Sequence, residues 1–510
     1  MLAIVNSVVL VGLEGQSVRV EVDISNGLPL CDIVGLPDPS VREARERVRA
    51  AIKNSGFDFP LRRIIVNLAP GDIKKEGPIY DLPIALGILM AAEAIGSGPE
   101  SAIYAVGELS LEGSLRPIPG VLPMALALQE IQPGAIFIVP AANANEAALA
   151  TRLRVLAAES LAQVVAYWRG EGELQEIKAA AGDRPPPACR GVDLADIKGQ
   201  MAAKRGLEIA AAGGHNILLI GSPGAGKTML ARSLPTILPP LTYEEALTVT
   251  KIYSAAGLLA PGQGLVTERP FRTPHHTAST ASIIGGGRIP KPGEVSLATH
   301  GVLFLDEMAE YRRDVLEALR QPLEDRVVTV SRVAAAITYP ADFLLVGSMN
   351  PCPCGYYGDQ VKECLCTPHQ VAQYRKRLSG PLLDRIDLHL EVPRLTYREV
   401  EAVIPAENSV TVRKRVQIAR QRQLERLKGT GVTCNAAMTP QQVHRFCRLA
   451  PQARSILRDA FNKLGLSMRA HDRLLKVART IADLAGEETI TAAHLAEAIQ
   501  YRSLDWGERA

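Results

Sequence analysis

GSPGAGKT, at residues 221–228, matches the GxxxxGK[ST] pattern of a phosphate-binding loop. The apolar run NILLI at 216–220 precedes it and predicts a buried strand, and residues 229–234 begin a predicted helix. Glycines let successive backbone N–H groups close around phosphate oxygens at the N-terminus of such a helix. Lys227 is then expected to reach the β- and γ-phosphates, and the Thr228 hydroxyl to hold Mg²⁺. The residues expected to bind the nucleotide are Gly221, Ser222, Pro223, Gly224, Ala225, Gly226, Lys227 and Thr228.

A second motif supplies the acids that a phosphate-binding loop needs. VLFLDE at 302–307 consists of four apolar residues typical of a buried parallel strand, followed by two carboxylates. Asp306 is expected beside the Mg²⁺ ion, and Glu307 is expected to polarise the attacking water. Asn350 follows another buried strand and is a candidate for orienting that water, although an Asn before a proline is equally typical of a turn. Together these motifs predict hydrolysis of ATP or GTP.

The composition is that of an ordinary soluble globular protein. The chain has 510 residues, of which 47% are hydrophobic and 22% charged, and this length indicates two to four domains. No apolar run approaches the roughly 20 residues that span a bilayer. Residues 1–13 are apolar but lack a basic leader and a small-residue cleavage site. We therefore expect a cytoplasmic protein without a membrane partner.

The order of patterns along the chain predicts an α/β protein with a helical C-terminal part. Residues 1–172 alternate β-rich runs with helical stretches, as expected for a complete α/β domain. The RPPP run at 184–187 favours an extended spacer, so we assign 173–190 to a linker. A second α/β domain is expected over 191–394. The remaining residues, 395–510, are almost purely helical in pattern.

The charge is unevenly distributed. The net charge of the whole chain is +3, yet residues 411–480 hold sixteen Lys and Arg against three acids, a net of 16 − 3 = +13. Such a block on a folded domain indicates a polyanionic partner. A solvated helical face explains the charge equally well.

Half of the eight cysteines fall within fifteen positions, at Cys352, Cys354, Cys364 and Cys366. Four thiolates make a closed tetrahedral zinc site, and a cytoplasmic setting disfavours disulfides. Only one residue separates the cysteines of each pair, fewer than the usual two to four, so reduced thiols without a metal are the alternative. We favour structural Zn²⁺, with His369 as a spare ligand.

Taken in order, these motifs resemble the magnesium-chelatase-like clade of AAA+ ATPases. They are DIKGQ at 196–200, the phosphate-binding loop, FLDE at 304–307, Asn350, and GPLLDRID at 380–387. More closely, the chain is similar to the ComM/YifB family. The stretches typical of that family are RPFRTPHH at 269–276, NPCPCG at 350–355 and VARTIADL at 477–484. The resemblance covers essentially the whole chain.

The resemblance implies a homo-oligomeric ring, expected to be a hexamer, with ATP between subunits. It makes Arg385 the arginine finger that reaches a neighbour's γ-phosphate, and Arg469 the second sensor on a C-terminal helical lid. From spacing alone, either arginine could form an ordinary surface ion pair. ComM-type members resemble helicases that drive branch migration during homologous recombination in natural transformation. The expected partners are therefore single-stranded and branched DNA, together with recombination proteins.

Two regions are expected to meet DNA in the ring's pore. One is the glycine-rich stretch 255–292, and the other is a predicted hairpin over 325–340. Structural loops that support the ring are the alternative. The residues expected to contact DNA are Phe271, Arg272, Arg288 and Arg332. His275 and His276 are more typical of capping or packing than of metal binding, since no cysteine or second histidine pair stands nearby.

Residues 1–172 resemble the fold shared by ribosomal protein S5 domain 2 and the Lon proteolytic domain. That resemblance places Ile79 at the position of the Lon nucleophile and Leu122 at that of its lysine. A serine–lysine dyad needs a hydroxyl and an amine, so this chain is not expected to be a protease. The module is expected to act as a DNA-binding or ring-scaffolding platform, and the basic helix at 40–55 fits either that role or a solvated face.

Two other functions compete with a DNA motor. One is an ATPase that remodels a protein partner, as the motor subunits of magnesium chelatase do. The other is a scaffold that needs no ATP, which the intact loop and both acids disfavour.

Overall fold

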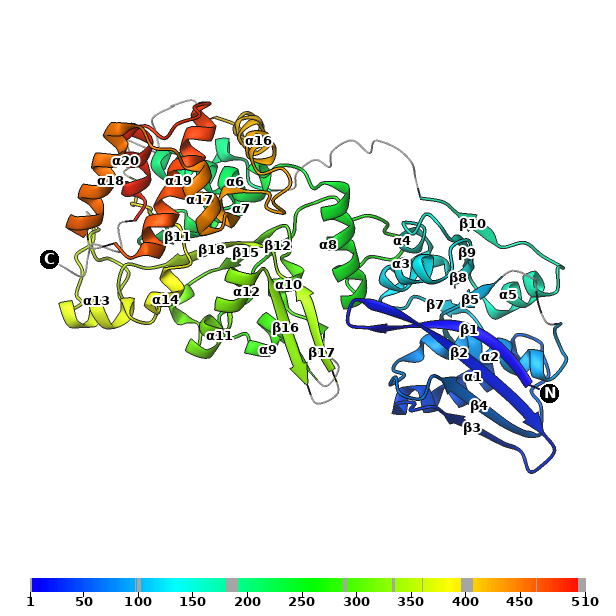
Figure 1. Ribbon diagram of the computed structural model, residues 1–510. Helices are drawn as coiled ribbons and strands as arrows, with labels where there is room; N and C mark the ends of the chain where they lie inside the picture. Colours follow the sequence, from blue (N-terminus) through cyan, green and yellow to red (C-terminus); the bar gives the residue numbers. More distant parts are fainter. Residues whose placement is uncertain are drawn as a thin grey trace. The chain divides into compact units, whose positions relative to one another are not determined.

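The computed structural model describes residues 2–96, 98, 102–179, 191–287, 291–332, 335–359, 361–395, 407–464 and 466–502. They form two compact units (Figure 1). The first contains the described residues of Met1–Pro185 together with Thr242–Val266, and the second contains those of Pro186–Leu241 and Thr267–Ala510. Thr242–Val266 therefore folds with the N-terminal unit, although the sequence placed it inside the domain at 191–394.

An eight-stranded mixed sheet forms the centre of the first unit, in the order β10-β9-β8-β5-β1-β2-β4-β3. β10 pairs antiparallel with β9, so part of the expected linker at 173–190 extends this sheet at its edge. A separate two-stranded pair, β6 with β7, lies outside it. The strands are β1 (Leu2–Val11), β2 (Glu14–Ser25), β3 (Leu30–Val34), β4 (Arg63–Ala69), β5 (Ile103–Ala105), β6 (Glu108–Leu109), β7 (Leu115–Arg116), β8 (Ile136–Pro140), β9 (Arg154–Ala158) and β10 (Gln175–Ile177).

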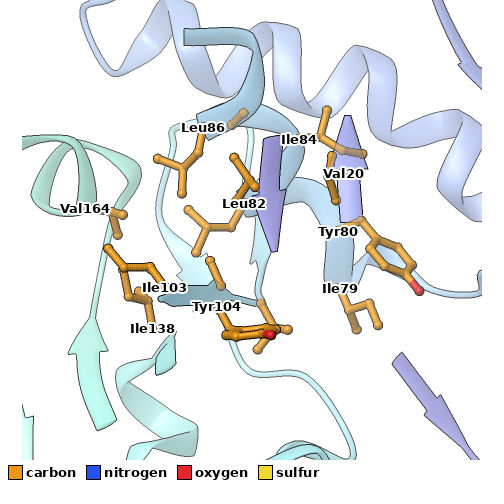
Figure 2. Close-up of a cluster of buried hydrophobic side chains, with 14 of the residues drawn as sticks. Val20, Ile79, Tyr80, Leu82, Ile84, Leu86, Ile103, Tyr104, Ile138 and Val164 are labelled. Atoms are coloured by element: carbon orange, nitrogen blue, oxygen red, sulfur yellow. The ribbon is translucent and has the colours of Figure 1, made fainter. Parts of the chain in front are cut away.

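The helices of the first unit cover this sheet and close its core. Helix α2 is apolar on every side and almost wholly buried, as its sequence requires. Figure 2 shows Leu82, Ile84 and Leu86 of α2 packed with Val20 and Ile103 of the sheet. The helices are α1 (Pro39–Asn54), α2 (Asp81–Ala91), α3 (Val121–Ile131), α4 (Ala144–Ala147), α5 (Leu161–Trp168) and α8 (Tyr243–Ala256), with short 3₁₀ turns at Pro78–Tyr80 and Ala141–Asn143.

Helix α8 joins the first unit through a buried polar cluster. The backbone N–H of Leu122 contacts Glu146 Oε2 and Ser254 Oγ, each at 3.3 Å, and Asn143 Nδ2 donates to Glu146 Oε1 at 2.6 Å. Burial raises the pKa of Glu146, while hydrogen bonds from Ser254, Asn143 and the Leu122 N–H oppose the rise. The sequence alone does not predict the contact between Leu122 and Ser254, because 132 residues separate them in the chain.

A five-stranded parallel sheet forms the centre of the second unit, in the order β12-β15-β18-β11-β19. Its strands are β11 (Ile217–Ile220), β12 (Phe271–Arg272), β15 (Val302–Leu305), β18 (Leu344–Met349) and β19 (Leu388–Glu391). The predicted α/β fold with a parallel sheet is confirmed. Because the strands are parallel, the carboxyl ends of β11, β15 and β18 meet at one edge of the sheet.

Helices and two small hairpins surround this sheet. Figure 1 shows the β16–β17 hairpin projecting from the body of the unit, away from the C-terminal helices. The remaining elements before residue 395 are α6 (Met201–Gly213), α7 (Lys227–Ile237), α9 (Thr280–Ile284), β13 (Gly285–Gly286), β14 (Lys291–Pro292), α10 (Glu294–Leu297), α11 (Arg313–Ala318), α12 (Arg320–Asp325), β16 (Val327–Arg332), β17 (Ala335–Pro340), α13 (Pro368–Arg375) and α14 (Gly380–Leu383), with 3₁₀ turns at Leu194–Asp196 and Met308–Glu310.

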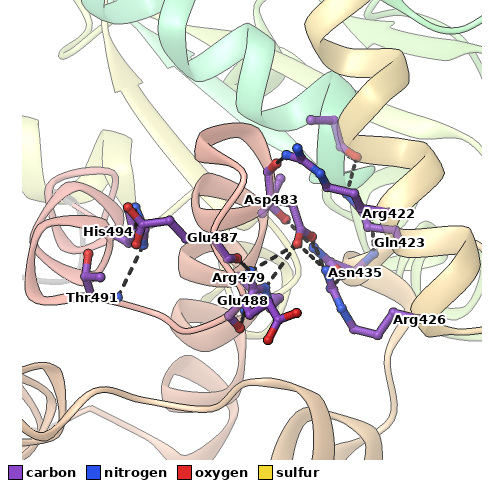
Figure 3. A network of polar contacts seen from close by, with 12 residues as sticks. Arg422, Gln423, Arg426, Asn435, Arg479, Asp483, Glu487, Glu488, Thr491 and His494 are labelled. Atoms are coloured by element: carbon purple, nitrogen blue, oxygen red, sulfur yellow. Dashed lines mark hydrogen bonds and ion pairs between the residues drawn. The ribbon is translucent and has the colours of Figure 1, made fainter.

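The predicted helical C-terminal part is also confirmed, and a buried ionic network ties its helices together (Figure 3). Arg479, in α19, is only 1% exposed and pairs with Asp483, which also accepts hydrogen bonds from Asn435 and Arg426. Full pairing is what makes such buried charges tolerable. The VARTIADL stretch is thus a packing element. The helices are α16 (Ser409–Arg426), α17 (Pro440–Phe446), α18 (Pro451–Leu464), α19 (Met468–Ala485) and α20 (Ala492–Gln500), with a 3₁₀ turn at Asn435–Ala437.

Within the described ranges, no helix is both long and apolar enough to cross a bilayer.

Candidate nucleotide site and its surroundings

The phosphate-binding loop connects β11 to α7, as its sequence predicts. Helix α7 begins at Lys227, and Gly226 before it has a φ of +92°, a left-handed conformation that favours glycine. This turn leaves the first N–H groups of α7 without partners inside the helix, at its positively polarised end. The local backbone is therefore suited to binding an anion.

Lys227 lies over its own loop and beside Asn350. Its Nζ atom donates to the carbonyl oxygens of Gly221 at 2.6 Å and Ser222 at 3.1 Å, and to Asn350 Oδ1 at 3.2 Å. Burial lowers the pKa of Lys227, while the charges of Asp306 and Glu307 oppose that change. The structure thus brings together three of the residues that the sequence assigns to catalysis: Lys227, Asp306 and Asn350.

Asp306 follows β15 and faces the loop. The Thr228 hydroxyl donates to Asp306 Oδ2 at 3.3 Å, so a hydroxyl and a carboxylate oxygen lie side by side. Oxygen donors of this kind are what Mg²⁺ takes in nucleotide sites, so the residues fit the expected ion. The hydroxyl of Ser348 donates to the other carboxylate oxygen, Asp306 Oδ1.

Ser348 is a further residue of this site, and the sequence motifs did not predict it. It lies in β18, the strand that pairs with β15 in a register that sets Leu305 opposite Gly347. Only its position could have identified it. Ser348 is a polar residue near the carboxyl end of a buried strand next to β15, and the carboxyl ends of these parallel strands lie at the same edge of the sheet as Asp306. Ser348 is fully buried and also accepts the backbone N–H of Glu307 at 3.2 Å.

Glu307 stands exposed beside this cluster. Its φ of +51° is a left-handed conformation, uncommon for a residue with a side chain. The carboxylate is 60% exposed, and its Oε2 atom lies 4.0 Å from Nδ1 of His276. A solvent-facing carboxylate next to the loop can reach a water molecule, as the predicted role requires.

The RPFRTPHH stretch places His276 close to Glu307 and His275 beside His276. The His275 and His276 rings lie 4.1 Å apart, and Nδ1 of His275 lies 2.8 Å from the Thr277 hydroxyl. Tyr311 fixes the same segment, because its hydroxyl donates to the Pro274 carbonyl at 2.6 Å. These are the packing and turn contacts expected for His275. The approach of His276 to Glu307 was not expected.

Arg385 and Arg469 lie near Glu324. The Arg385 side chain is only 9% exposed; it pairs with Glu324 at 2.5 Å and donates to the Pro381 carbonyl at 2.6 Å. The pKa of Glu324 is lowered mainly by the hydrogen bond from Arg385, and to a smaller extent by the positive charges of Arg385, Arg469 and Arg473. Arg469 is exposed, near the start of α19. Arg385 thus pairs with Glu324 directly, while Arg469 acts on that acid through its charge.

The four clustered cysteines converge, as predicted from their spacing. Their sulfur atoms all lie within 4.8 Å of one another, and Cys352 is buried. Across the described residues, they form the sole His, Cys, Asp and Glu group with the geometry to hold a metal ion. Such a thiolate set suits Zn²⁺.

Two of the residues expected to contact DNA have contacts within the second unit. Phe271 stacks on Phe304 with ring centroids 6.0 Å apart, and Arg272 pairs with both oxygens of Glu294, at 2.7 and 2.9 Å. Both residues form β12, at the edge of the central sheet, so they hold that edge together. Arg288 lies outside the described residues. Arg332 is the last residue of β16, and its side chain is not described.

The two regions expected to line a pore are neighbours. A Cβ atom at Gly285 of β13 would lie 3.5 Å from Val330 in β16. The predicted hairpin over 325–340 is present as β16 and β17, which pair from Val327 with Pro340 to Arg332 with Ala335.

The basic block at 411–480 divides into two sets. Some arginines hold helices together: Arg413 donates to the Thr236 carbonyl at 2.7 Å, and Arg415 pairs with Glu208 at 2.6 Å. Nine of the sixteen Lys and Arg side chains are exposed to solvent, so part of the charge stabilises the fold and part lies on the surface. The exposed members are Lys414, Arg422, Lys428, Arg445, Arg448, Arg454, Arg458, Lys463 and Arg469.

The positions that correspond to a Lon dyad hold buried apolar side chains. Ile79 is 5% exposed and Leu122 is fully buried. Neither offers a hydroxyl or an amine, so these two positions serve the core of the first unit.

Three family models together match most of the chain. The model described as magnesium chelatase, subunit ChlI, matches residues 193–400, that described as subunit ChlI of Mg-chelatase matches 20–143, and the subunit ChlI C-terminal model matches 406–502.

Two of the relatives described here match along almost the full length of the chain, and a third matches part of it. The YifB protein of Salmonella typhimurium is 46% identical over 505 residues, which cover 99% of this chain and 97% of that protein. The competence protein ComM of Haemophilus influenzae is 44% identical over 508 residues, which cover 99% of this chain and 98% of that protein. The magnesium-chelatase 67 kDa subunit of Heliobacterium mobile is 26% identical over 229 residues, 39% of this chain and 33% of that subunit.

Proposed function

Because the chain belongs to the ComM/YifB family of magnesium-chelatase-like AAA+ proteins, we propose that it is an ATP-driven hexameric DNA motor. It moves branched joint molecules during homologous recombination of incoming DNA in natural transformation. The observation that carries this proposal is the cluster of Lys227, Thr228, Asp306 and Asn350 at one edge of the parallel sheet. The 44% identity to a competence protein supports the biological setting.

The residues of the cluster have distinct tasks. The loop amides and Lys227 bind the phosphates of ATP, while Asn350, which touches Lys227, orients the attacking water. Thr228 and Asp306 hold Mg²⁺, which neutralises charge on the phosphate oxygens when bound. Glu307 accepts the proton of the water. Together these groups cleave the bond to the γ-phosphate.

Arg385 completes the site of a neighbouring subunit. In the described chain its guanidinium is held by Glu324 rather than by its own phosphate-binding loop. In the ring it leaves Glu324 and stabilises the charge on the neighbour's γ-phosphate. Arg469, exposed at the start of α19, senses the same nucleotide from the lid. Hydrolysis therefore depends on assembly.

DNA contacts come from the β16–β17 hairpin, from the neighbouring strands β13 and β14, and from the exposed basic residues of the C-terminal helices. Arg454 and Arg458 are four residues apart in α18, so they lie on one face, and both are exposed. Such a face tracks a phosphate backbone without reading its sequence.

A specific observation favours a second function. The similarity to the magnesium-chelatase 67 kDa subunit supports an ATPase that remodels a protein partner. A motor of that kind hydrolyses ATP without regard to DNA.

The test uses a labelled three- or four-stranded joint molecule at one stated salt concentration, because binding to phosphates depends on salt. The full chain with ATP and Mg²⁺ is expected to move the branch and release a labelled product strand. Lys227→Ala, which cannot bind the phosphates, is expected to release none. Equal release by the two proteins, or none by either, would overturn the DNA-motor proposal.

A further inference from the structure

The loop that carries the four clustered cysteines lies against the phosphate-binding loop. The function proposed above assigns no role to this contact. The cysteine loop is defined here as residues 350–367. It leaves β18 at Asn350, passes through all four clustered cysteines and ends where α13 begins at Pro368.

The sulfur atoms have the spacing of a metal site. Cys352 Sγ lies 3.3 Å from Cys354 Sγ and 3.6 Å from Cys364 Sγ, and the last two atoms are 3.6 Å apart. A tetrahedral zinc ion with Zn–S bonds of about 2.3 Å sets its sulfurs about 3.8 Å apart. Backbone N–H groups also point at the sulfurs: that of Tyr357 lies 3.3 Å from Cys352 Sγ, and that of Cys366 lies 3.4 Å from Cys364 Sγ. Such bonds orient metal ligands.

The cysteine loop has little else to hold its shape. None of its described residues belongs to a helix or strand. Its large apolar side chains face solvent, with Tyr357, Val361 and Leu365 exposed by 50%, 71% and 87%. A segment that buries so little apolar surface depends on cross-links for its order, and a bound metal supplies them.

Two points of the cysteine loop contact the phosphate-binding loop. Asn350 Oδ1 accepts from Lys227 Nζ at 3.2 Å. Gly355, with a φ of +86°, packs so closely on Pro223 that an added Cβ atom would lie 2.8 Å from its Cδ. One face of the phosphate-binding loop therefore rests on the cysteine loop.

We propose that Cys352, Cys354, Cys364 and Cys366 bind one Zn²⁺ ion, and that this ion holds the cysteine loop against Pro223 and Lys227 so that tight ATP binding requires the metal. The ion takes no part in the chemistry of hydrolysis. It fixes the wall that positions the phosphate-binding loop, and a displacement of about 1 Å in such a wall lowers function by up to ~10²-fold. This inference rests on the ATP site proposed above.

The first test measures zinc content by mass spectrometry and binding of a fluorescent ATP analogue by titration with Mg²⁺, both on the full chain. We expect one zinc ion per chain. Removal of zinc with a thiophilic chelator should weaken analogue binding about tenfold or more, and added Zn²⁺ should restore it. Circular dichroism before and after removal shows whether the rest of the chain stays folded. A protein that binds no zinc, or one whose affinity for the analogue survives zinc removal, would overturn the proposal.

A matched pair of variants separates the contact from the metal. Gly355→Ala keeps all four cysteines but places a Cβ against Pro223, so zinc should stay bound while analogue binding weakens. Gly358→Ala is the control, because its φ of +77° imposes similar backbone strain while nothing lies within 4 Å of the added Cβ. Equal analogue affinity in the two variants would contradict the proposed contact.

The Lys227→Ala variant distinguishes a failure of the proposed ATP site from a failure of the proposed coupling between zinc and ATP binding. That variant should bind zinc normally and lose the ATP analogue. If the wild-type chain binds zinc but no ATP analogue under any condition, the proposed ATP site itself fails. If the chain binds both zinc and the ATP analogue, but zinc removal does not change the affinity for the analogue, only the proposed dependence of ATP binding on zinc fails.

Discussion

Asn350 Oδ1 lies 3.2 Å from Lys227 Nζ, although 123 residues separate the two in the chain. The contact joins the end of β18 to the start of α7, so it favours a catalytic position for Asn350 over a simple turn. Asn350→Ala is expected to lower kcat about 10²-fold, since loss of one positioned polar group has effects of that size, with little change in ATP affinity. Steady-state ATPase assays and analogue titration measure both. A large loss of affinity at unchanged kcat would assign Asn350 to binding instead.

Glu307 should be needed for hydrolysis but not for binding. Glu307→Gln removes the base while keeping a side chain of the same shape, so turnover should fall by about 10²–10⁴-fold and ATP should stay bound. Size-exclusion chromatography with ATP is expected to show a stable ring. Turnover close to wild type in this variant would assign the water-activating role to another group.

Ser348 is predicted to position Asp306 for the metal. Its hydroxyl donates to Asp306 Oδ1, and Thr228 occupies the other oxygen. Ser348→Ala leaves the carboxylate free to turn, so the Mg²⁺ concentration for half-maximal ATPase should rise about tenfold, as for other groups that orient metal ligands. Ser348→Thr, which retains the hydroxyl, is the matched control. An unchanged Mg²⁺ requirement in Ser348→Ala would count against this role.

The burial of His389 predicts that the stability of the folded chain falls at low pH. This residue is 1% exposed in β19, neither ring nitrogen has a hydrogen-bond partner among the described residues, and burial lowers its pKa to about 3. The unfolded chain, with an ordinary pKa near 6.5, therefore binds an additional proton between pH 6.5 and 3, so stability falls as the pH falls through that window. At pH 5 the loss is about 2 kcal/mol.

The measurement for His389 is the difference in Tm between wild type and His389→Leu from pH 7 to pH 5. Other groups titrate alike in both proteins, so the difference isolates His389. The wild-type Tm should drop more steeply than that of the variant. Parallel curves would show that His389 does not stay neutral in the folded state.

The exposed arginines of α18 should matter only with DNA. Replacing Arg454 and Arg458 by Ala is expected to leave basal ATPase unchanged. The slope of log DNA affinity against log salt should become less negative by about 1 for each lost phosphate contact. Arg454→Lys with Arg458→Lys retains the charge and is the control. An unchanged slope in the Ala variant would remove α18 from the DNA surface.

The parts of the nucleotide site that the sequence predicts are those encoded by contiguous motifs. GSPGAGKT at 221–228 and VLFLDE at 302–307 each combine a buried strand with the groups at its end, so parallel pairing of those strands is enough to bring the motifs together. The convergence of the four cysteines follows in the same way from their close spacing.

The features that the sequence does not predict depend on contacts between distant segments. Ser348 is one ordinary serine in an apolar strand, and Gly355 is one of 42 glycines, so neither stands out before the strands and loops are placed. The positive charge of Arg272 suggests a DNA contact, yet its guanidinium forms an ion pair with Glu294. Thr242–Val266 folds with the N-terminal unit because Ser254 fits a buried polar cluster there.

The most direct test of the account is the ATPase rate of the full chain with and without single-stranded and branched DNA, at one salt concentration. We predict strong stimulation by DNA that is lost in Arg385→Ala, because hydrolysis then lacks the arginine supplied by the neighbouring subunit. An ATPase rate that no DNA changes would contradict the account and favour a motor that acts on a protein.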